Sequence, residues 1–267
     1  MTKVAFLGAG NIAQAIIGGI IENGMAAKNI WAHDPSQFSM DWIRERGINA
    51  AKSNDEAIAA ADVLMLCVKP NILIEVLDNI SEDLSEKLLI SVVAGVTTGM
   101  MIPHLPTETA IVRCMPNTPV QVQSGMTGLF ATQAVTEEQR ILVENILTSV
   151  GQAVWIESET DLDSVTAVSG SGPAYFFLLM ESMISAAQAL GLKRELAKKL
   201  VLQTSLGAAK VASENLDDPK KLREKVTSPG GTTAAAIEHF QSAGFEKIVE
   251  GAIKAAHQRS REIANES

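Results

Sequence analysis

The sequence predicts an α/β protein in which a doubly wound sheet is followed by an all-helical domain. Three observations carry this prediction. Apolar, strand-like runs alternate with helical segments as far as Ile156, a glycine turn joins the first strand to the first helix, and the pattern from Asp161 onward is almost continuously helical. We therefore expect two domains, residues 1–159 and residues 160–267.

The composition is that of an ordinary globular protein. The chain has 267 residues, of which 46% are hydrophobic and 20% charged, and its net charge is −9. This balance argues against nucleic acid and membranes as partners, and the N-terminal residues lack a signal-peptide pattern, so we expect a cytoplasmic protein. Cys67 and Cys114 are expected to be buried thiols, and no Cys/His spacing suits a metal.

The first strand, Lys3 to Leu7, runs into Gly8-Ala9-Gly10-Asn11-Ile12-Ala13, which opens a helix. This is the G-x-G-x-x-A pattern in the strand–turn–helix context that gives the pattern its meaning. Gly8 makes the turn, Gly10 lets the backbone approach a pyrophosphate, and Ala13 keeps the helix close to the strand. A purely structural glycine turn is the alternative.

The second strand, Ile30 to His33, is followed by Asp34. An acid at this distance from the glycine turn binds the adenosine ribose in NAD-dependent proteins. With the strand, turn, helix and acid in register, the N-terminal region is predicted to be a Rossmann-type dinucleotide-binding domain.

The alternation continues to the end of this domain. The remaining expected elements are helices at about 39–46, 54–61 and 136–149, and strands near 48 and at 62–68, 88–93, 110–115, 127–131 and 153–156. Gly151 is expected to cap the last of these helices. The strand at 62–68 is apolar on both faces, which is typical of a buried parallel strand, and it ends at Lys69 and Pro70. Lys69 is either a ligand contact or a solvated strand end.

The second domain contains a helix that is apolar all round. From Tyr175 to Ile184 it has little polar face, so it must be buried in something larger than one small domain, and we expect the core of a dimer. The segment 169–173 constrains the start of this helix, and further helices are expected at 195–214, 219–226, 234–242 and 245–264.

A turn rich in hydroxyl groups lies between two of these helices. Ser228, Thr232 and Thr233 surround Pro229-Gly230-Gly231, directly before a helix whose free N–H groups can bind a small anion. An ordinary N-cap with a tight turn is the alternative.

Five motifs together resemble the pyrroline-5-carboxylate reductase family. They are Gly8-Ala9-Gly10-Asn11-Ile12-Ala13, Val68-Lys69-Pro70, Met115-Pro116-Asn117-Thr118-Pro119, Ser169-Gly170-Ser171-Gly172-Pro173-Ala174-Tyr175 and Ser228-Pro229-Gly230-Gly231-Thr232-Thr233. The resemblance implies reduction of 1-pyrroline-5-carboxylate to proline with NAD(P)H, the last step of proline biosynthesis. It also implies a homodimer made by the helical domain, which in many members assembles into a decamer of five dimers.

The resemblance also assigns roles to residues. The cofactor is expected to be held by Leu7, Gly8, Ala9, Gly10, Asn11, Ile12, Asp34, Asn54, Cys67, Val68, Lys69, Pro70, Val93, Ala94 and Gly95. The substrate is expected to be bound by Asn117, Ser171, Gly230, Gly231, Thr232 and Thr233. Thr233 is our candidate for the catalytic hydroxyl nearest the imine nitrogen, with Ser228 as its substitute.

The choice of cofactor stays open at this point. Family members commonly use NADP(H), but Asp34 would repel the additional phosphate, whereas His33, Ser36 and Gln37 could offset that repulsion. NADP(H) is therefore expected, with NAD(H) as the alternative.

Two other functions fit parts of the pattern. A related 3-hydroxy acid dehydrogenase would need a base such as Lys198, Lys199 or Lys210, and a non-catalytic NAD(P)-sensing protein would not need the hydroxyl-rich turn.

Overall fold

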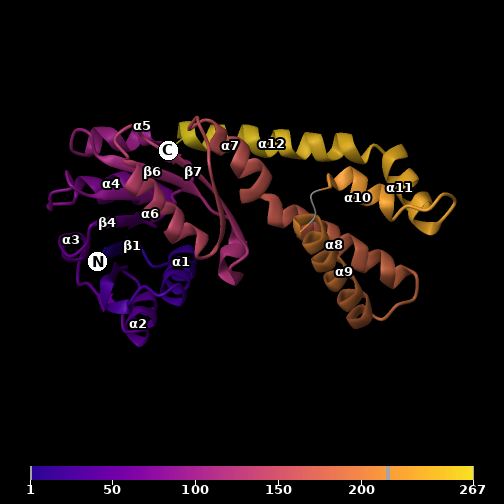
Figure 1. The fold of residues 1–267 in the computed structure, drawn as a ribbon, viewed down its shortest axis with the longest axis horizontal. Coiled ribbons are helices and arrows are strands. Elements are labelled where there is room, and N and C mark those ends of the chain that lie inside the picture. Colours follow the sequence, from indigo (N-terminus) through magenta and orange to yellow (C-terminus); the bar gives the residue numbers. More distant parts are fainter. Residues whose placement is uncertain (1, 215–216, 267) are drawn as a thin grey trace. The chain divides into compact units, whose positions relative to one another are not determined.

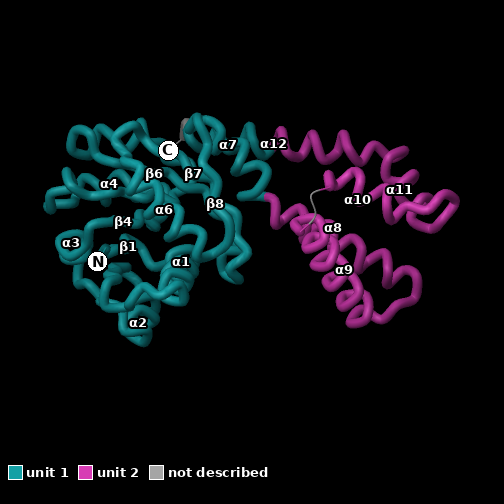
Figure 2. The backbone as a smooth tube through the Cα atoms, in the orientation of Figure 1, with its two compact units in different colours: residues 1–171, 256–267 teal, residues 172–255 magenta. Residues whose placement is uncertain are grey.

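A computed structural model describes residues 2–214 and 217–266. The chain divides into two compact units, coloured separately in Figure 2. Unit 1 runs to Ser171 and includes the residues from Ala256 onward, and unit 2 comprises Gly172–Ala255. The boundary that we place at 159/160 marks a change of sequence pattern, and as a boundary between functional domains it stays a prediction.

Unit 1 is built on one sheet, and it confirms the predicted fold class. The eight strands are ordered β3-β2-β1-β4-β5-β6-β7-β8. Their bounds are β1 Val4–Leu7, β2 Ile30–His33, β3 Asn49–Ala50, β4 Val63–Leu66, β5 Leu88–Ser91, β6 Ala110–Met115, β7 Gly125–Ala131 and β8 Gly151–Trp155. Neighbouring strands are parallel except for the antiparallel pair β6 and β7. Strands β1 and β4–β6 are almost wholly buried, as apolar parallel strands must be.

Helices cover both faces of this sheet (Figure 1). One apolar cluster joins the sheet to α1 (Asn11–Glu22), α2 (Gln37–Glu45) and α6 (Glu137–Thr148). The other cluster joins it to α3 (Asn54–Ala59), α4 (Leu73–Asp78) and α5 (Thr98–Met101). The sequence did not predict α4 and α5, because helices of six and four residues are too short to show a helical period.

The connections of unit 1 contain short 3-10 turns, and one predicted cap is wrong. The turns are η1 Ala27–Asn29, η2 Pro70–Ile72, η3 Ile102–His104 and η4 Thr118–Val122. Gly151 begins β8 instead of capping α6, whose C-cap is Ser149. Its φ is +147°, and a Cβ there would lie 2.1 Å from the Gly125 carbonyl oxygen, so glycine is needed for two strands to approach.

A helical segment that belongs to unit 1 follows β8. It contains α7 (Asp161–Val165) and a π-helical turn, Thr166–Gly170. The end of the last helix, α12 (Phe245–Glu266), is attached to this segment, since the Ser260 hydroxyl donates to the Asp163 carboxylate at 2.7 Å.

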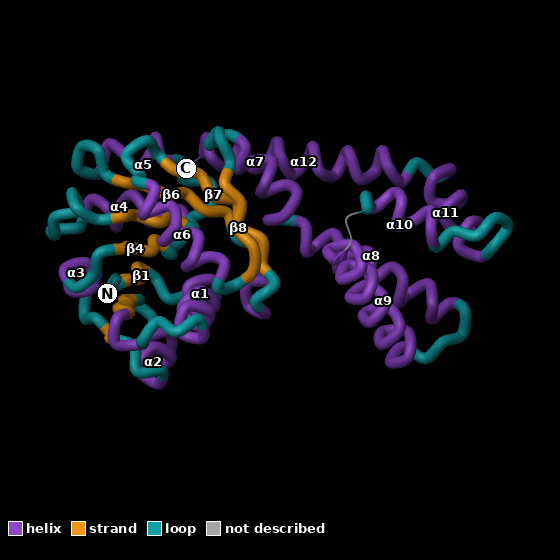
Figure 3. The backbone as a smooth tube through the Cα atoms, viewed as in Figure 1, coloured by secondary structure: helices purple, strands orange, loops and turns teal. Residues whose placement is uncertain are grey.

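Unit 2 is all-helical (Figure 3). Its helices are α8 Gly172–Ala189, α9 Arg194–Glu214, α10 Pro219–Lys225, α11 Thr232–Ser242 and the first part of α12. Among its described residues, only Gly172, Ala197 and Val201 are buried. Within 2–214 and 217–266, no helix combines the length and the apolar character needed to cross a membrane.

Candidate functional site

The predicted cofactor residues lie along one edge of the sheet in unit 1. Strands β1, β4, β5 and β6 are adjacent and parallel, so their carboxyl ends meet at the same edge. Gly8, Cys67, Val93 and Asn117 follow these strands in turn. Ligands of open α/β sheets bind at this edge, where the order of strands reverses on either side of β1.

The glycine turn has the two properties that the motif predicts. Gly8 has φ +94°, and a Cβ there would lie 2.7 Å from the Cys67 carbonyl oxygen, so a larger residue would push β1 and β4 apart. A Cβ on Gly10 would meet no atom within 4 Å. The space above Gly10 is open, and Gly10 caps α1 without a side-chain hydrogen bond. The first N–H groups of α1 therefore lie beside open space, where an anion can approach them.

Asp34 has a more specific position than its motif indicated. Its Oδ2 accepts a hydrogen bond from the Ala9 N–H at 2.7 Å, and its Oδ1 accepts one from the Ser36 N–H at 2.8 Å. The carboxylate thus holds the glycine turn to the end of β2, supported by the Gly8 N–H, which donates to the His33 carbonyl at 2.8 Å. The sequence analysis did not predict the two hydrogen bonds of Asp34, because a motif gives the spacing of residues and not their hydrogen-bond partners.

The other predicted cofactor residues line the same edge with different exposure. Lys69 and Pro70 are exposed after β4, and Cys67 and Val68 are half-buried. Burial raises the pKa of the Cys67 thiol far above its usual range, so this thiol stays protonated at neutral pH. After β5, Val93 is buried and Ala94 exposed, and Gly95 has φ +78°. Asn54 follows β3, the outermost strand on one side of the sheet. It is the first residue of α3, whose N-cap is Ser53.

Asn117 joins two of the predicted motifs. Its Nδ2 donates to the Ser169 carbonyl at 3.1 Å, and its Oδ1 accepts from the Met126 N–H at 2.9 Å. The amide of this predicted substrate residue is thus bonded on both sides within unit 1. Ser171, at the end of the π-helical turn, is half-buried, and its N–H donates to the Thr166 carbonyl at 2.8 Å.

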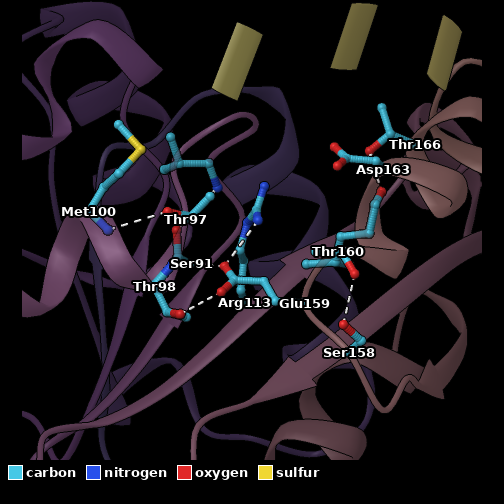
Figure 4. Close-up of polar contacts among 12 residues, drawn as sticks. Ser91, Thr97, Thr98, Met100, Arg113, Ser158, Glu159, Thr160, Asp163 and Thr166 are labelled. Carbon is cyan, nitrogen blue, oxygen red and sulfur yellow. Dashed lines mark hydrogen bonds and ion pairs between the residues drawn. The ribbon is translucent and has the colours of Figure 1, made fainter. Parts of the chain in front are cut away.

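A polar network that the sequence analysis missed fixes the chain where it leaves the sheet (Figure 4). The Glu159 carboxylate accepts from the Thr98 N–H at 2.7 Å, from the Thr98 hydroxyl at 2.5 Å and from the Arg113 guanidinium at 3.0 Å. The Arg113 side chain is 10% exposed and that of Glu159 21%, so a lone charge here would be poorly solvated. The available signal was an arginine in the otherwise apolar run 110–115.

The hydroxyl-rich turn lies in unit 2. Gly230 has φ +70°, and the Gly231 N–H donates to the Ser228 carbonyl at 3.0 Å, which closes the turn before α11. Ser228, Thr232 and Thr233 are exposed, and among the described residues no hydrogen bond engages their side chains. The structure thus presents the predicted hydroxyls beside the start of an eleven-residue helix.

Both parts of the chain match families of known proteins. Residues 159–263 match a family described as pyrroline-5-carboxylate reductase dimerisation, and residues 3–95 match one described as NADP oxidoreductase, coenzyme F420-dependent. A pyrroline-5-carboxylate reductase of Pseudomonas aeruginosa is 46% identical over 99% of this chain and 97% of its own length. The chain belongs to the pyrroline-5-carboxylate reductase family.

Solved structures of family members agree with this assignment. A pyrroline-5-carboxylate reductase from Coxiella burnetii is 40% identical, with a TM-score of 0.94 over 98% of both chains. The pyrroline carboxylate reductase of Plasmodium falciparum, whose structure contains NADP, is 34% identical, with a TM-score of 0.87 over 98% of both chains. The match described as dimerisation covers the helical part of the chain, which also carries the exposed apolar residues of unit 2.

Proposed function

We propose that this protein reduces 1-pyrroline-5-carboxylate to proline with a reduced nicotinamide cofactor. The observation that carries the proposal is the presence, in one chain of the pyrroline-5-carboxylate reductase family, of an open glycine turn at a parallel sheet edge and a hydroxyl-rich turn at a helix start. The first suits a pyrophosphate, and the second suits a small carboxylate.

The residues of unit 1 fit a dinucleotide. The free N–H groups at the start of α1 would bind the pyrophosphate over Gly10, and the ends of β4 and β5 would contact the rest of the cofactor. We keep the predicted set for this role: Leu7, Gly8, Ala9, Gly10, Asn11, Ile12, Asp34, Asn54, Cys67, Val68, Lys69, Pro70, Val93, Ala94 and Gly95. When bound, the reduced nicotinamide supplies the hydride.

The residues of the turn in unit 2 would bind and orient the substrate. A protonated cyclic imine already carries positive charge on nitrogen, so the protein must orient the ring and bind its carboxylate. The Gly231 N–H closes the turn on the Ser228 carbonyl, so the N–H groups of Gly230, Thr232 and Thr233 and the Thr232 hydroxyl would bind the carboxylate. The Thr233 hydroxyl would face the imine nitrogen, with Ser228 as its substitute.

For the cofactor we propose NADP(H), with NAD(H) as the weaker alternative. The N-terminal match to an NADP oxidoreductase family and the NADP in the Plasmodium falciparum structure support this choice. Asp34 opposes it, because an ionised carboxylate adds repulsion to a 2′-phosphate placed near the end of β2. Its charge is shared with two N–H donors, Ala9 and Ser36, which lessens that repulsion.

We propose further that residues 160–267 form the dimerisation and substrate domain, and that the turn of one chain completes the site of its partner. The dimerisation family that matches 159–263 supports the first statement. A decamer of five dimers and a cytoplasmic location are further expectations, and the free thiols of Cys67 and Cys114 suit a reducing compartment.

The test is oxidation of NADPH and of NADH by the purified protein with and without 1-pyrroline-5-carboxylate. We expect imine-dependent oxidation and a loss of kcat/KM of about 100-fold in Thr233→Ala, the scale measured when a donor that acts in the transition state is removed. Ser242→Ala is the matched control, because it removes a hydroxyl from the other end of α11 that bonds to the His239 carbonyl. Cofactor binding without imine turnover would contradict the proposal and favour a sensing protein.

A further inference from the structure

The π-helical turn Thr166–Gly170 has a carbonyl, that of Ser169, which cannot receive the usual α-helical hydrogen bond. In a regular α-helix the Ser169 carbonyl would accept from the N–H of residue 173. That residue is Pro173, which has no N–H. The donor is supplied by Asn117, whose Nδ2 reaches the Ser169 carbonyl at 3.1 Å from a position 52 residues earlier in the chain. A π-turn of this kind often marks a functional site.

The amide oxygen of Asn117 accepts a hydrogen bond from the start of β7. Pairing between β6 and β7 ends where Met115 faces Gly128, so Met126 lies beyond the paired residues. The Met126 N–H donates to Asn117 Oδ1 at 2.9 Å. Asn117 is half-buried and therefore connects the carboxyl end of β6, the start of β7 and the π-helical turn.

Packing brings the turn close to the same strand end. Gly170 lies against the end of the Met115 side chain, since a Cβ placed on it would be 2.7 Å from Met115 Cε, so the turn packs on the last residue of β6. Met115, Asn117, Ser169 and Gly170 all belong to unit 1, and their arrangement does not depend on where unit 2 lies.

We propose that Asn117 is a positioning residue and does not touch the substrate. Its amide holds the π-helical turn at the carboxyl end of β6, and so fixes Ser171 relative to the cofactor edge of the same unit. This role rests on the proposed function and on the expectation that Ser171 binds the substrate. A displacement of about 1 Å in such a group is enough to lower turnover by about 100-fold.

Asn117→Asp is the sharpest variant. It keeps the size of the side chain and the oxygen that accepts from Met126, but it replaces the Nδ2 donor by an oxygen that faces the Ser169 carbonyl. Asn79→Asp is the matched control, because Asn79 Nδ2 donates in the same way to the Glu75 carbonyl, and both residues are exposed at the end of α4.

The readouts are amide hydrogen exchange over residues 166–176, imine kinetics and NADPH affinity by fluorescence. In Asn117→Asp we expect exchange of this segment to become at least about tenfold faster, because its tertiary anchor is lost. We also expect kcat/KM for the imine to fall about 10- to 100-fold and the NADPH Kd to stay within about twofold, and Asn79→Asp to change none of these.

Two outcomes would overturn the proposal. A loss of imine turnover with unchanged exchange at 166–176 would mean that Asn117 contacts the substrate directly. Faster exchange with unchanged turnover would mean that the turn does not matter to the reaction. A wild-type protein that does not reduce the imine would refute the proposed function alone. The exchange rates would still show whether the Asn117 amide holds the π-helical turn.

A second variant tests whether Asn117 replaces the missing N–H. Pro173→Ala restores an N–H at residue 173, so Asn117→Asp should accelerate exchange at least about threefold less in that background than in the wild type. Equal acceleration in both backgrounds would contradict the proposed replacement.

Discussion

Unit 1 has a buried apolar core, whereas unit 2 leaves nearly all of its described apolar residues at least partly exposed. Both core clusters consist of unit 1 residues, and β1 and β4 are buried throughout. On α8, by contrast, Phe176 is 64% exposed, Phe177 62% and Leu178 63%. Exposure of this kind marks an interface, and the family match names it as dimerisation. Unit 1 therefore has its core within one chain, and for unit 2 we propose that a second copy covers the exposed apolar residues.

The largest expected effect is the loss of dimerisation through the exposed apolar residues of unit 2. Leu178→Asp places a charge in the apolar face of α8, and we expect the dimer Kd to rise by more than about 100-fold, because an unpaired charge is costly to bury. Light scattering coupled to gel filtration measures it. Phe38→Asp is the control, since Phe38 is 80% exposed on unit 1 and its replacement should leave the mass unchanged. An intact dimer in Leu178→Asp would show that α8 lies outside the interface.

The next effect concerns the edge of unit 1. Gly8→Ala combines a φ of +94° with a contact of 2.7 Å to the Cys67 carbonyl oxygen, so we expect the NADPH Kd to rise at least about tenfold as the turn is displaced. Gly24→Ala is matched in φ, at +97°, but meets no atom within 4 Å. Gly24→Ala should cost about 1 kcal/mol of stability, because a residue with a Cβ is disfavoured at positive φ, and should leave the NADPH Kd unchanged. Equal Kd changes in both variants would contradict the assigned role of Gly8.

A smaller effect concerns cofactor preference. Asp34→Asn removes the charge but keeps an oxygen that can accept from the Ala9 or Ser36 N–H. The ratio of kcat/KM for NADPH to that for NADH should rise about tenfold, because a nearby like charge is lost. An unchanged ratio would mean that Asp34 only holds the glycine turn through its hydrogen bond from the Ala9 N–H and does not affect cofactor preference.

The smallest effect tests the burial of unit 1. Burial raises the pKa of the Cys114 thiol far above its usual range, and the side chain lies on β6 with 2% exposure. The thiol therefore stays protonated and inaccessible, and we expect it to react with a disulfide reagent only after unfolding. Rapid labelling of Cys114 in the native protein would show that the sheet opens.

The sequence predicted the fold where the signal was regular and missed contacts between distant residues. Buried strands such as β4 and β5 are continuous apolar runs, and the glycine turn has a known geometry, so both were predicted. The hydrogen bonds of Asp34, Asn117 and Glu159 to Ala9, Ser169 and Thr98 each join residues at least 25 positions apart, and no local pattern reveals such partners. Gly151 was misassigned because a helix end and a close strand approach both favour glycine.

The most direct test of the account is a mixture of two impaired variants. Gly8→Ala impairs the cofactor edge, and Thr233→Ala impairs the turn. If each site combines unit 1 of one chain with the turn of its partner, hybrid dimers contain one intact site, and co-refolded variants should regain about a quarter of wild-type imine reduction. Activity no greater than that of the two variants measured separately would contradict a site shared between the chains.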